Sequence, residues 1–163
     1  MAIRKIMIKG EPVLAAHCRP VTSFDGRLAT LLDDLKETLS KSGGVGLAAP
    51  QVGVLRRVVI VMETNVPEGE EYMIELVNPE IIEEDGEQTG PEGCLSYPGK
   101  YGIVTRPDHV KVRAQDRNGN TFEVEGEHLT ARCFCHEIDH LEGIMFTERA
   151  ERMLRPDEYE VDD

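Results

Sequence analysis

The sequence has no tryptophan, and aromatic residues make up only 5% of its 163 residues. Basic side chains are also scarce, because 18 Lys and Arg stand against 31 Asp and Glu, which gives a net charge of −13. A chain this acidic repels phosphate backbones and anionic lipid surfaces, so we expect binding neither to nucleic acid nor to a membrane surface. No apolar run approaches the roughly 18 residues that a membrane-spanning helix needs. The first residues lack the apolar segment of a signal peptide, and we therefore expect a cytoplasmic protein.

Cysteine is rare as well, with only Cys18, Cys94, Cys133 and Cys135 in the chain. None of them forms a CxxC pair, and Cys133 and Cys135 are too close in sequence for an unstrained disulfide within a regular element. In a reducing compartment such a set indicates buried thiols, a metal ligand or a nucleophile. Their neighbours must decide between these possibilities.

Hydrophobic periodicity predicts an α+β protein. Leucines at helical spacing predict a helix over 27–42 that ends at Gly43. Strand patterns occur at 57–62, at 72–77 with continuation to about 82, at 110–115 and at 121–125. Residues 83–93 are acidic and rich in turn formers, and a second helical pattern starts at Leu129 and ends near Gly143. We predict a single domain over 1–163 with mostly antiparallel sheets packed around the late helix, and a short charged tail over 148–163.

The late helix contains the pattern H-E-x-x-H at 136–140. His136 and His140 are four residues apart, so their imidazoles lie one above the other on a helix and can hold one divalent metal ion. Glu137 is then placed to act as a general base on water. A catalytic site of this kind needs a third protein ligand and one open position. Because no His or Cys follows His140, we expect the third ligand upstream, at Cys94 in the turn-like segment 92–98.

A glycine-rich segment over 43–53 is the third chemical feature. Small residues allow a backbone to approach a ligand closely, and Gln51 offers an uncharged amide donor that can stabilise an oxyanion. The segment lacks the lysine of a phosphate-binding P-loop.

Together, these three segments resemble the motifs of peptide deformylases, which carry G-x-G-L-A-A-x-Q, E-G-C-L-S and H-E-x-D-H in this order. The corresponding segments here are 44–51, 92–96 and 136–140. The resemblance extends from about residue 3 to residue 146, which is nearly the whole chain. It implies a hydrolase of protein biosynthesis that removes the formyl group from the N-terminal formyl-methionine of new bacterial polypeptides.

The resemblance also implies a set of roles. Cys94, His136 and His140 would bind one divalent metal ion, with water in the fourth position. The ion is usually Fe²⁺ in the family, and Zn²⁺, Ni²⁺ or Co²⁺ can replace it. Glu137 would take a proton from the water and pass it to the leaving amine.

Other residues would bind the substrate. The main-chain N–H of Leu95 and the side chain of Gln51 would stabilise the tetrahedral oxyanion. Gly46 would shape the formyl end of the site, and Val45 and Gly93 would pair with the peptide backbone as an added strand does.

The pocket for the methionine side chain would include Leu129 and Cys133. The alternative interpretation is that these two residues pack in the core, and the two interpretations are compatible.

Some positions depart from the pattern of the deformylases that the chain resembles. Tyr101 stands where some relatives have Arg, which concerns the peptide beyond the methionine. Cys135 replaces Gln and is expected to point away from the metal ligands. Arg132 replaces an apolar residue and is expected at the rim of the substrate pocket. Asp139 either orients a ligand or pairs with Arg106, and the alternative is an exposed carboxylate.

The tail also differs from the long basic helix through which certain deformylases contact the ribosome. Pro156 and the acidic residues after it predict an extended or frayed tail. Ribosome association is therefore not expected to involve the tail.

Three alternatives to deformylation remain open from sequence. The first is a metal-dependent peptidase or formamide hydrolase on the same scaffold. The second is a protein without enzymatic activity, stabilised by a metal or by a partner. The third is a cysteine protease that uses Cys94 with a histidine; its thiol would alkylate without metal chelation, whereas a metal-bound thiolate would be protected.

Overall fold

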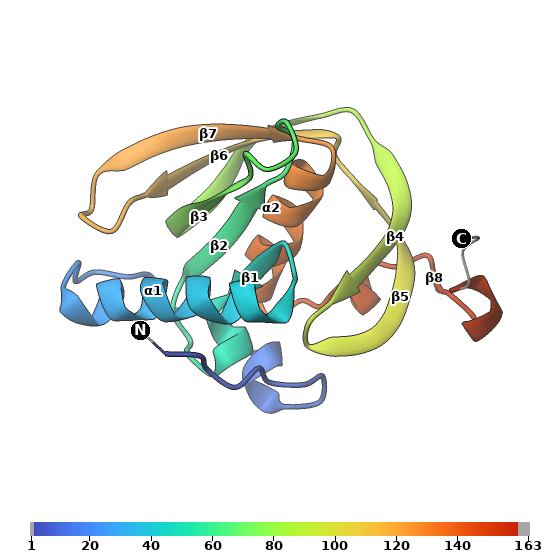
Figure 1. Ribbon diagram of the computed structural model, residues 1–163, viewed down its shortest axis with the longest axis horizontal. Coiled ribbons are helices and arrows are strands. Elements are labelled where there is room, and N and C mark those ends of the chain that lie inside the picture. Colours follow the sequence, from blue (N-terminus) through green and yellow to red (C-terminus); the bar gives the residue numbers. More distant parts are fainter. Residues whose placement is uncertain (1, 160–163) are drawn as a thin grey trace.

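A computed structural model describes residues 2–159 of the chain (Figure 1). The helical elements are η1 (Pro12–Ala15), α1 (Gly26–Ser42), η2 (Ala49–Val52), α2 (Leu129–Leu141), η3 (Phe146–Glu148) and η4 (Pro156–Glu158). The strands are β1 (Gly46–Ala48), β2 (Val58–Glu63), β3 (Tyr72–Asp85), β4 (Gln88–Cys94), β5 (Tyr97–Arg106), β6 (His109–Gln115), β7 (Thr121–Glu127) and β8 (Arg152–Met153). Within the described residues, no helix is both long enough and apolar enough to cross a membrane.

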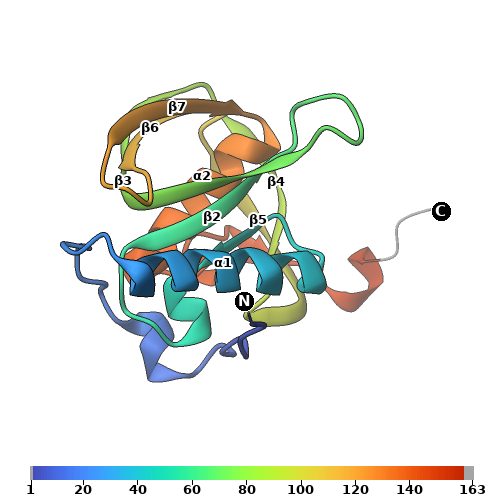
Figure 2. The same ribbon diagram turned by 60° about the vertical axis from the view of Figure 1, so that its left-hand side comes forward.

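The strands form two antiparallel sheets. The larger sheet has five strands in the order β1-β2-β3-β6-β7, and the smaller has three in the order β4-β5-β8. Every strand pair in both sheets is antiparallel. Figures 1 and 2 show α1 outside the larger sheet and α2 enclosed between that sheet and the β4–β5 hairpin. The predicted α+β fold with a late helix at its centre is confirmed.

Strand β2 lies between two apolar cores, one on each face of the sheet. Val58 and Ile60 pack with the leucines of α1, whereas Val59 and Val61 pack with residues of α2. Successive side chains of a strand point to opposite faces. The continuous apolar run of β2 therefore reflects a strand covered on both sides.

Helix α1 has clear sequence signals at both ends. The Asp25 side chain accepts a hydrogen bond from the Leu28 N–H, and Gly43 adopts a left-handed conformation with φ 76° that ends the helix. Its inward stripe consists of Leu28, Leu31, Leu32, Leu35 and Leu39, all fully or almost fully buried. The helix predicted over 27–42 is confirmed to within one residue.

Helix α2 begins and ends at unusual backbone positions. His128, directly before the helix, has φ 59°, and no side chain caps the first turn. Gly143, after the helix, has φ 76°, and a Cβ there would lie 2.6 Å from the Ala15 carbonyl oxygen. The predicted stop at Gly143 therefore reflects both backbone conformation and close packing.

The expected turn-rich stretch over 83–93 is wrong for most of its length. Strand β3 continues to Asp85, the chain turns at Gly86 with φ 69°, and β4 starts at Gln88. Within β4 only Glu92 is buried, so the strand has no apolar alternation by which it could be recognised. Backbone pairing with β5 holds it in place.

The charged tail is more ordered than expected up to Tyr159. It is extended as predicted, but Arg152 and Met153 pair with β5 as strand β8, and Pro156–Glu158 forms a 3-10 turn. Residues 160–163 of the predicted tail lie outside the described residues.

Candidate active site

The three chemical segments converge on one cavity of about 490 Å³ between α2, the β4–β5 hairpin and the loop before β1. Helix α2 contributes His136 and Glu137, β4 ends at Cys94, and Gln51 lies in η2. All the predicted site residues except His140 line this cavity, namely Val45, Gly46, Gln51, Gly93, Cys94, Leu95, Leu129, Cys133, His136 and Glu137.

One thiol and two imidazoles form a tight cluster at the base of the cavity. The Cys94 Sγ lies 3.4 Å from the His140 Nε2, and one ligand atom each from Cys94, His136 and His140 lies within 4.8 Å of the others. The two imidazole rings are 4.9 Å apart, as their spacing on a helix predicts. Burial lowers the pKa of His140 well below its ordinary value, whereas the burial of His136 is outweighed by its contacts with Glu137, Cys94 and Glu92, which raise the pKa of that ring.

Glu137 is buried beside this cluster. Its Oε2 lies 4.0 Å from the His136 Nε2, and its Oε1 has no hydrogen-bond partner among residues 2–159. Burial raises the pKa of Glu137 to about 7, although the charge of His136 opposes the shift. A carboxyl group with this pKa can both accept and release a proton near neutrality.

Gln51 is almost fully buried and its amide has a fixed orientation. The Oε1 accepts a hydrogen bond from the Ala48 N–H at 2.9 Å. The Nε2 therefore faces the cavity, where it donates to the Ser96 Oγ at 3.1 Å and to the Cys94 Sγ at 3.5 Å. The side chain is held as a donor at the edge of the thiol–imidazole cluster.

Gly46 lies against the side chains of α2 and has no room for a side chain of its own. A Cβ at this position would lie 2.5 Å from the Cys133 Sγ and 2.6 Å from the Glu137 Oε2. The Cys133 thiol also donates to the Val45 carbonyl oxygen at 3.3 Å. Glycine at this position thus lets the loop close directly over Glu137.

The structure adds a residue whose role the sequence did not predict. Glu92 is buried, and its Oε2 accepts hydrogen bonds from the His136 Nδ1 and from Arg106, both at 2.6 Å. Its Oε1 accepts from Arg106 at 3.1 Å and from Arg132 at 2.8 Å. Burial opposes ionisation, but the hydrogen bonds from His136 and Arg106 hold the pKa of Glu92 well below its usual range.

This contact fixes the orientation of the His136 ring. With its Nδ1 engaged by a carboxylate, His136 presents its Nε2 to the cavity. The sequence signal was a charged residue two positions before Cys94, but its partners on β5 and α2 are distant in the chain.

Three further expectations are settled by the side-chain contacts. Asp139 pairs with Arg106 at 2.8 Å, in addition to Arg149. Arg132 lines the cavity, but its guanidinium is buried and donates to Glu92 and to the Val104 carbonyl oxygen. Cys135 packs in the core with strands of the larger sheet.

Comparison with known proteins agrees with this geometry. Residues 3–155 match the family model described as polypeptide deformylase. The chain is 52% identical over 160 residues to the peptide deformylase of Agathobacter rectalis, with 98% of each chain covered. It is 56% identical over 152 residues to that of Lachnoclostridium phytofermentans, with 91% of this chain and 90% of the relative covered.

Solved structures show the same similarity. The peptide deformylase of Thermotoga maritima superposes with a TM-score of 0.86 at 36% identity, covering 93% of this chain and 99% of that one. The enzyme of Legionella pneumophila gives a TM-score of 0.84 at 42% identity, covering 95% and 88%. The chain therefore belongs to the polypeptide deformylase family.

Proposed function

We propose that this protein removes the formyl group from the N-terminal formyl-methionine of newly made polypeptides and releases formate. One observation carries the proposal: a thiol, two imidazoles, a buried carboxyl group of raised pKa and an oriented amide meet at one cavity. The match to the deformylase family over residues 3–155 supports it.

We propose that Cys94, His136 and His140 hold one divalent metal ion. The deformylase family is metal-dependent, and the three ligand atoms lie within 4.8 Å of one another. One thiolate and two imidazoles suit Fe²⁺, Zn²⁺, Ni²⁺ and Co²⁺ and leave a position open for water or substrate. When bound, the ion supplies Lewis acidity that lowers the pKa of water and polarises a carbonyl group. We propose Fe²⁺ as the resident ion.

Glu137 is the proton carrier in this proposal. The Glu137 Oε1 has no hydrogen-bond partner among residues 2–159, so it is available to bind the water that attacks the formyl carbon. The carboxylate accepts a proton from this water and transfers it to the amine of the departing methionine. A pKa of about 7 suits both steps.

Gln51 and the main-chain N–H of Leu95 stabilise the oxyanion that forms at the formyl oxygen. The Ala48 N–H orients the Gln51 amide with its Nε2 toward the cavity, and one Nε2 hydrogen exchanges its bond to Cys94 or Ser96 for one to the oxyanion.

Val45 and Gly93, which both line the cavity, bind the peptide backbone, and Gly46 shapes its formyl end. Leu129 and Cys133 line the pocket for the methionine side chain. Burial raises the pKa of the Cys133 thiol well above its ordinary value, so this residue is an apolar surface and not a second nucleophile.

Formate release from a formyl-methionyl peptide tests the proposal, with anaerobically prepared protein and a metal assay. We expect rapid release by the wild type with about one metal ion per chain, and a loss of at least about a hundredfold in Glu137→Ala with the metal retained. Glu127→Ala, an exposed glutamate on β7, is the matched control and is expected to keep full activity.

Two outcomes would contradict the proposal. Bound metal without formate release would favour a peptidase or another formamide hydrolase on this scaffold. Absence of bound metal, together with ready alkylation of Cys94, would overturn the assignment of the ligands. The proposal places the activity in the cytoplasm, and any ribosome contact would lie outside the tail.

A further inference from the structure

One exposed aromatic ring forms part of the wall of the cavity. Tyr101 lies opposite Gly93 in the β4–β5 pairing, and 43% of its surface is exposed. A Cβ on Gly93 would lie 2.6 Å from the Tyr101 Cε1, so the ring rests directly on the Gly93 backbone. Both residues line the cavity. Any peptide that runs along Gly93 must therefore pass this ring.

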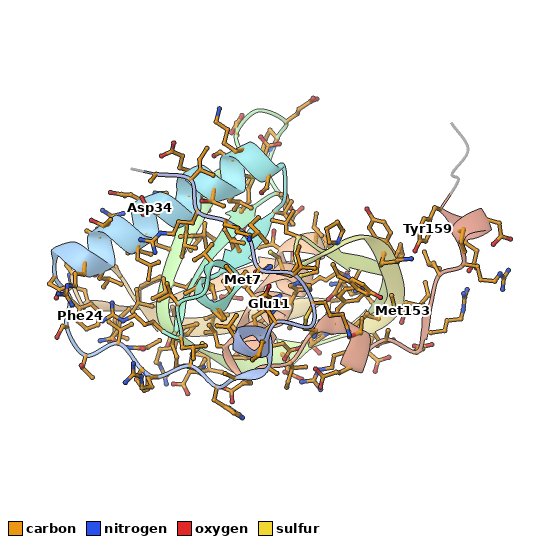
Figure 3. All side chains as sticks on the ribbon, turned by 90° about the horizontal axis from the view of Figure 1, so that it is seen from below. Met7, Glu11, Phe24, Asp34, Met153 and Tyr159 are labelled. Carbon is orange, nitrogen blue, oxygen red and sulfur yellow. The ribbon has the colours of Figure 1, made fainter. Side chains whose placement is uncertain are left out.

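A second tyrosine packs against Tyr101 from outside the cavity. The rings of Tyr101 and Tyr159 have their centroids 5.5 Å apart and meet edge to face at 85°. Tyr159 does not line the cavity and comes from the end of the described chain, on the same segment as Met153 (Figure 3). Edge-to-face packing is a favoured geometry for aromatic pairs.

Backbone hydrogen bonds attach this terminal segment to β5 at Tyr101 and at Ile103, on both sides of Gly102. The Leu154 N–H donates to the Tyr101 carbonyl oxygen at 2.8 Å, and the Glu151 N–H donates to the Ile103 carbonyl oxygen at 2.8 Å. Gly102 makes the close approach feasible, because a Cβ there would lie 2.9 Å from the Met153 Sδ. Strand β8 is thus held against the strand that carries Tyr101.

A small ion-paired turn connects β8 to Tyr159. The Glu158 carboxylate accepts hydrogen bonds from the Arg152 guanidinium at 3.0 Å and from the Arg155 N–H at 2.7 Å. These contacts close the 3-10 turn Pro156–Glu158, and Tyr159 follows it directly. The backbone at Tyr159 is therefore positioned by local contacts, and the ring packs against Tyr101.

We propose that Tyr159 is a positioning residue, which holds Tyr101 against Gly93 and so maintains the wall that contacts the residues following the formyl-methionine. This inference rests on the proposed function, and it concerns the preference for the substrate residues that follow the formyl-methionine. An aromatic ring held in one orientation offers a preformed apolar surface, and it favours large apolar side chains at those positions. Without Tyr159 the exposed Tyr101 ring must be ordered anew by each substrate.

Formate release from two substrates tests this role. Formyl-methionine amide ends at the methionine, whereas formyl-Met-Leu-Phe extends past Tyr101. In Tyr159→Ala we expect the KM for formyl-Met-Leu-Phe to rise about fivefold with kcat unchanged, and both constants for the amide to stay at wild-type values. At 1.4 kcal/mol per factor of ten, this change corresponds to about 1 kcal/mol, the size of one aromatic pair.

Two control variants separate positioning from a general structural effect. Tyr159→Phe keeps the ring and is expected to retain the wild-type KM for both substrates. Tyr72→Ala removes an exposed tyrosine on β3, which does not line this cavity, and is also expected to change nothing. An unchanged KM for the tripeptide in Tyr159→Ala, or an equal change for both substrates, would overturn the proposal.

A binding measurement keeps this test independent of the proposed function. If the wild type releases no formate from either substrate, the proposed function fails. Fluorescence anisotropy with labelled formyl-Met-Leu-Phe-Lys then measures Kd directly, and Tyr159→Ala is expected to weaken it about fivefold. Equal binding by wild type and variant, or no binding by the wild type, would overturn the role of Tyr159.

Discussion

Helices α1 and α2 cover opposite faces of the same sheet, but they bury very different side chains. Helix α1 buries a stripe of leucines, with Asp34 and Thr38 as its only buried polar residues. Helix α2 buries His136, Glu137 and His140, and also Arg132 and Thr130. Both helices are amphipathic. They differ in their buried polar side chains and in the residues to which these side chains are hydrogen-bonded.

The partners of α2 come mainly from the smaller sheet. Glu92 and Cys94 on β4 contact His136 and His140, whereas among residues 2–159 the buried polar groups of α1 accept side-chain hydrogen bonds only from Ala2 and Arg4. Buried polar groups need such partners, because a lone one is expensive to desolvate. The comparison indicates that α1 serves stability, while α2 serves both stability and chemistry. Three substitutions test this division, from the largest expected effect to the smallest.

Replacing Glu92 tests the α2 side and should have the largest effect. Glu92→Gln leaves the buried Arg132 without a counter-charge and Arg106 with Asp139 alone, and we expect the free energy of unfolding to fall by about 3–5 kcal/mol. Because His136 loses the carboxylate that orients it, metal affinity should fall by roughly 10–100-fold. Urea unfolding and metal titration measure the two effects. Glu80→Gln, an exposed glutamate on β3, is the control, and equal behaviour of the two variants would contradict the prediction.

Truncating a leucine of α1 tests the other side. Leu35 is fully buried, and Leu35→Ala should lower the free energy of unfolding by about 3 kcal/mol through lost burial and a residual cavity. The folded variant should keep the wild-type kcat/KM and one metal ion per chain. Denaturant unfolding and formate release check this, with the exposed Thr30→Ala as the control. A large loss of kcat/KM in fully folded protein would show that α1 also shapes the site.

Asp34 is the charged exception on α1, and its effect should be smaller and dependent on pH. Burial opposes ionisation, but hydrogen bonds from the Ala2 N–H and Arg4 lower the pKa of Asp34. A lowered pKa stabilises the fold above the pKa of the unfolded state, and this contribution disappears as the pH falls through the folded pKa. Asp34→Asn should therefore reduce the free energy of unfolding by about 1–2 kcal/mol at pH 7 and by less in acid.

The neighbouring Asp33 provides a matched control for this prediction. It is more exposed and pairs with Arg117, so Asp33→Asn should change the free energy of unfolding by less than about 0.5 kcal/mol. Urea unfolding of both variants at pH 7 and at pH 2, below the ordinary pKa of an aspartate, gives the comparison. A constant difference between Asp34→Asn and the wild type at the two pH values would contradict the ionic explanation.

Features set by short spacings could be predicted from the sequence. The leucine stripe of α1 and the alignment of His136 with His140 follow from helical periodicity alone. The glycine-rich loop and Cys94 could be assigned roles because they occur in a recognisable order, and the structure brings them to one cavity.

Features that depend on distant contacts were not predictable in this way. Strand β4 has one buried residue, Glu92, so its side chains give no periodic signal. The contacts of Glu92 join it to Arg106, Arg132 and His136, which are 14 to 44 positions further along the chain. The pairing of β8 with β5 depends on close approach at Gly102, which the sequence alone does not reveal.

The crowding around Gly46 has a consequence for drug resistance. A Cβ at this position would lie 2.6 Å from the Glu137 Oε2, so every substitution must displace the carboxyl group on which the proposed activity depends. An inhibitor that recognises the main chain at Gly46 would contact a position whose substitution also disturbs Glu137, so resistance by mutation of this residue would lower the proposed activity.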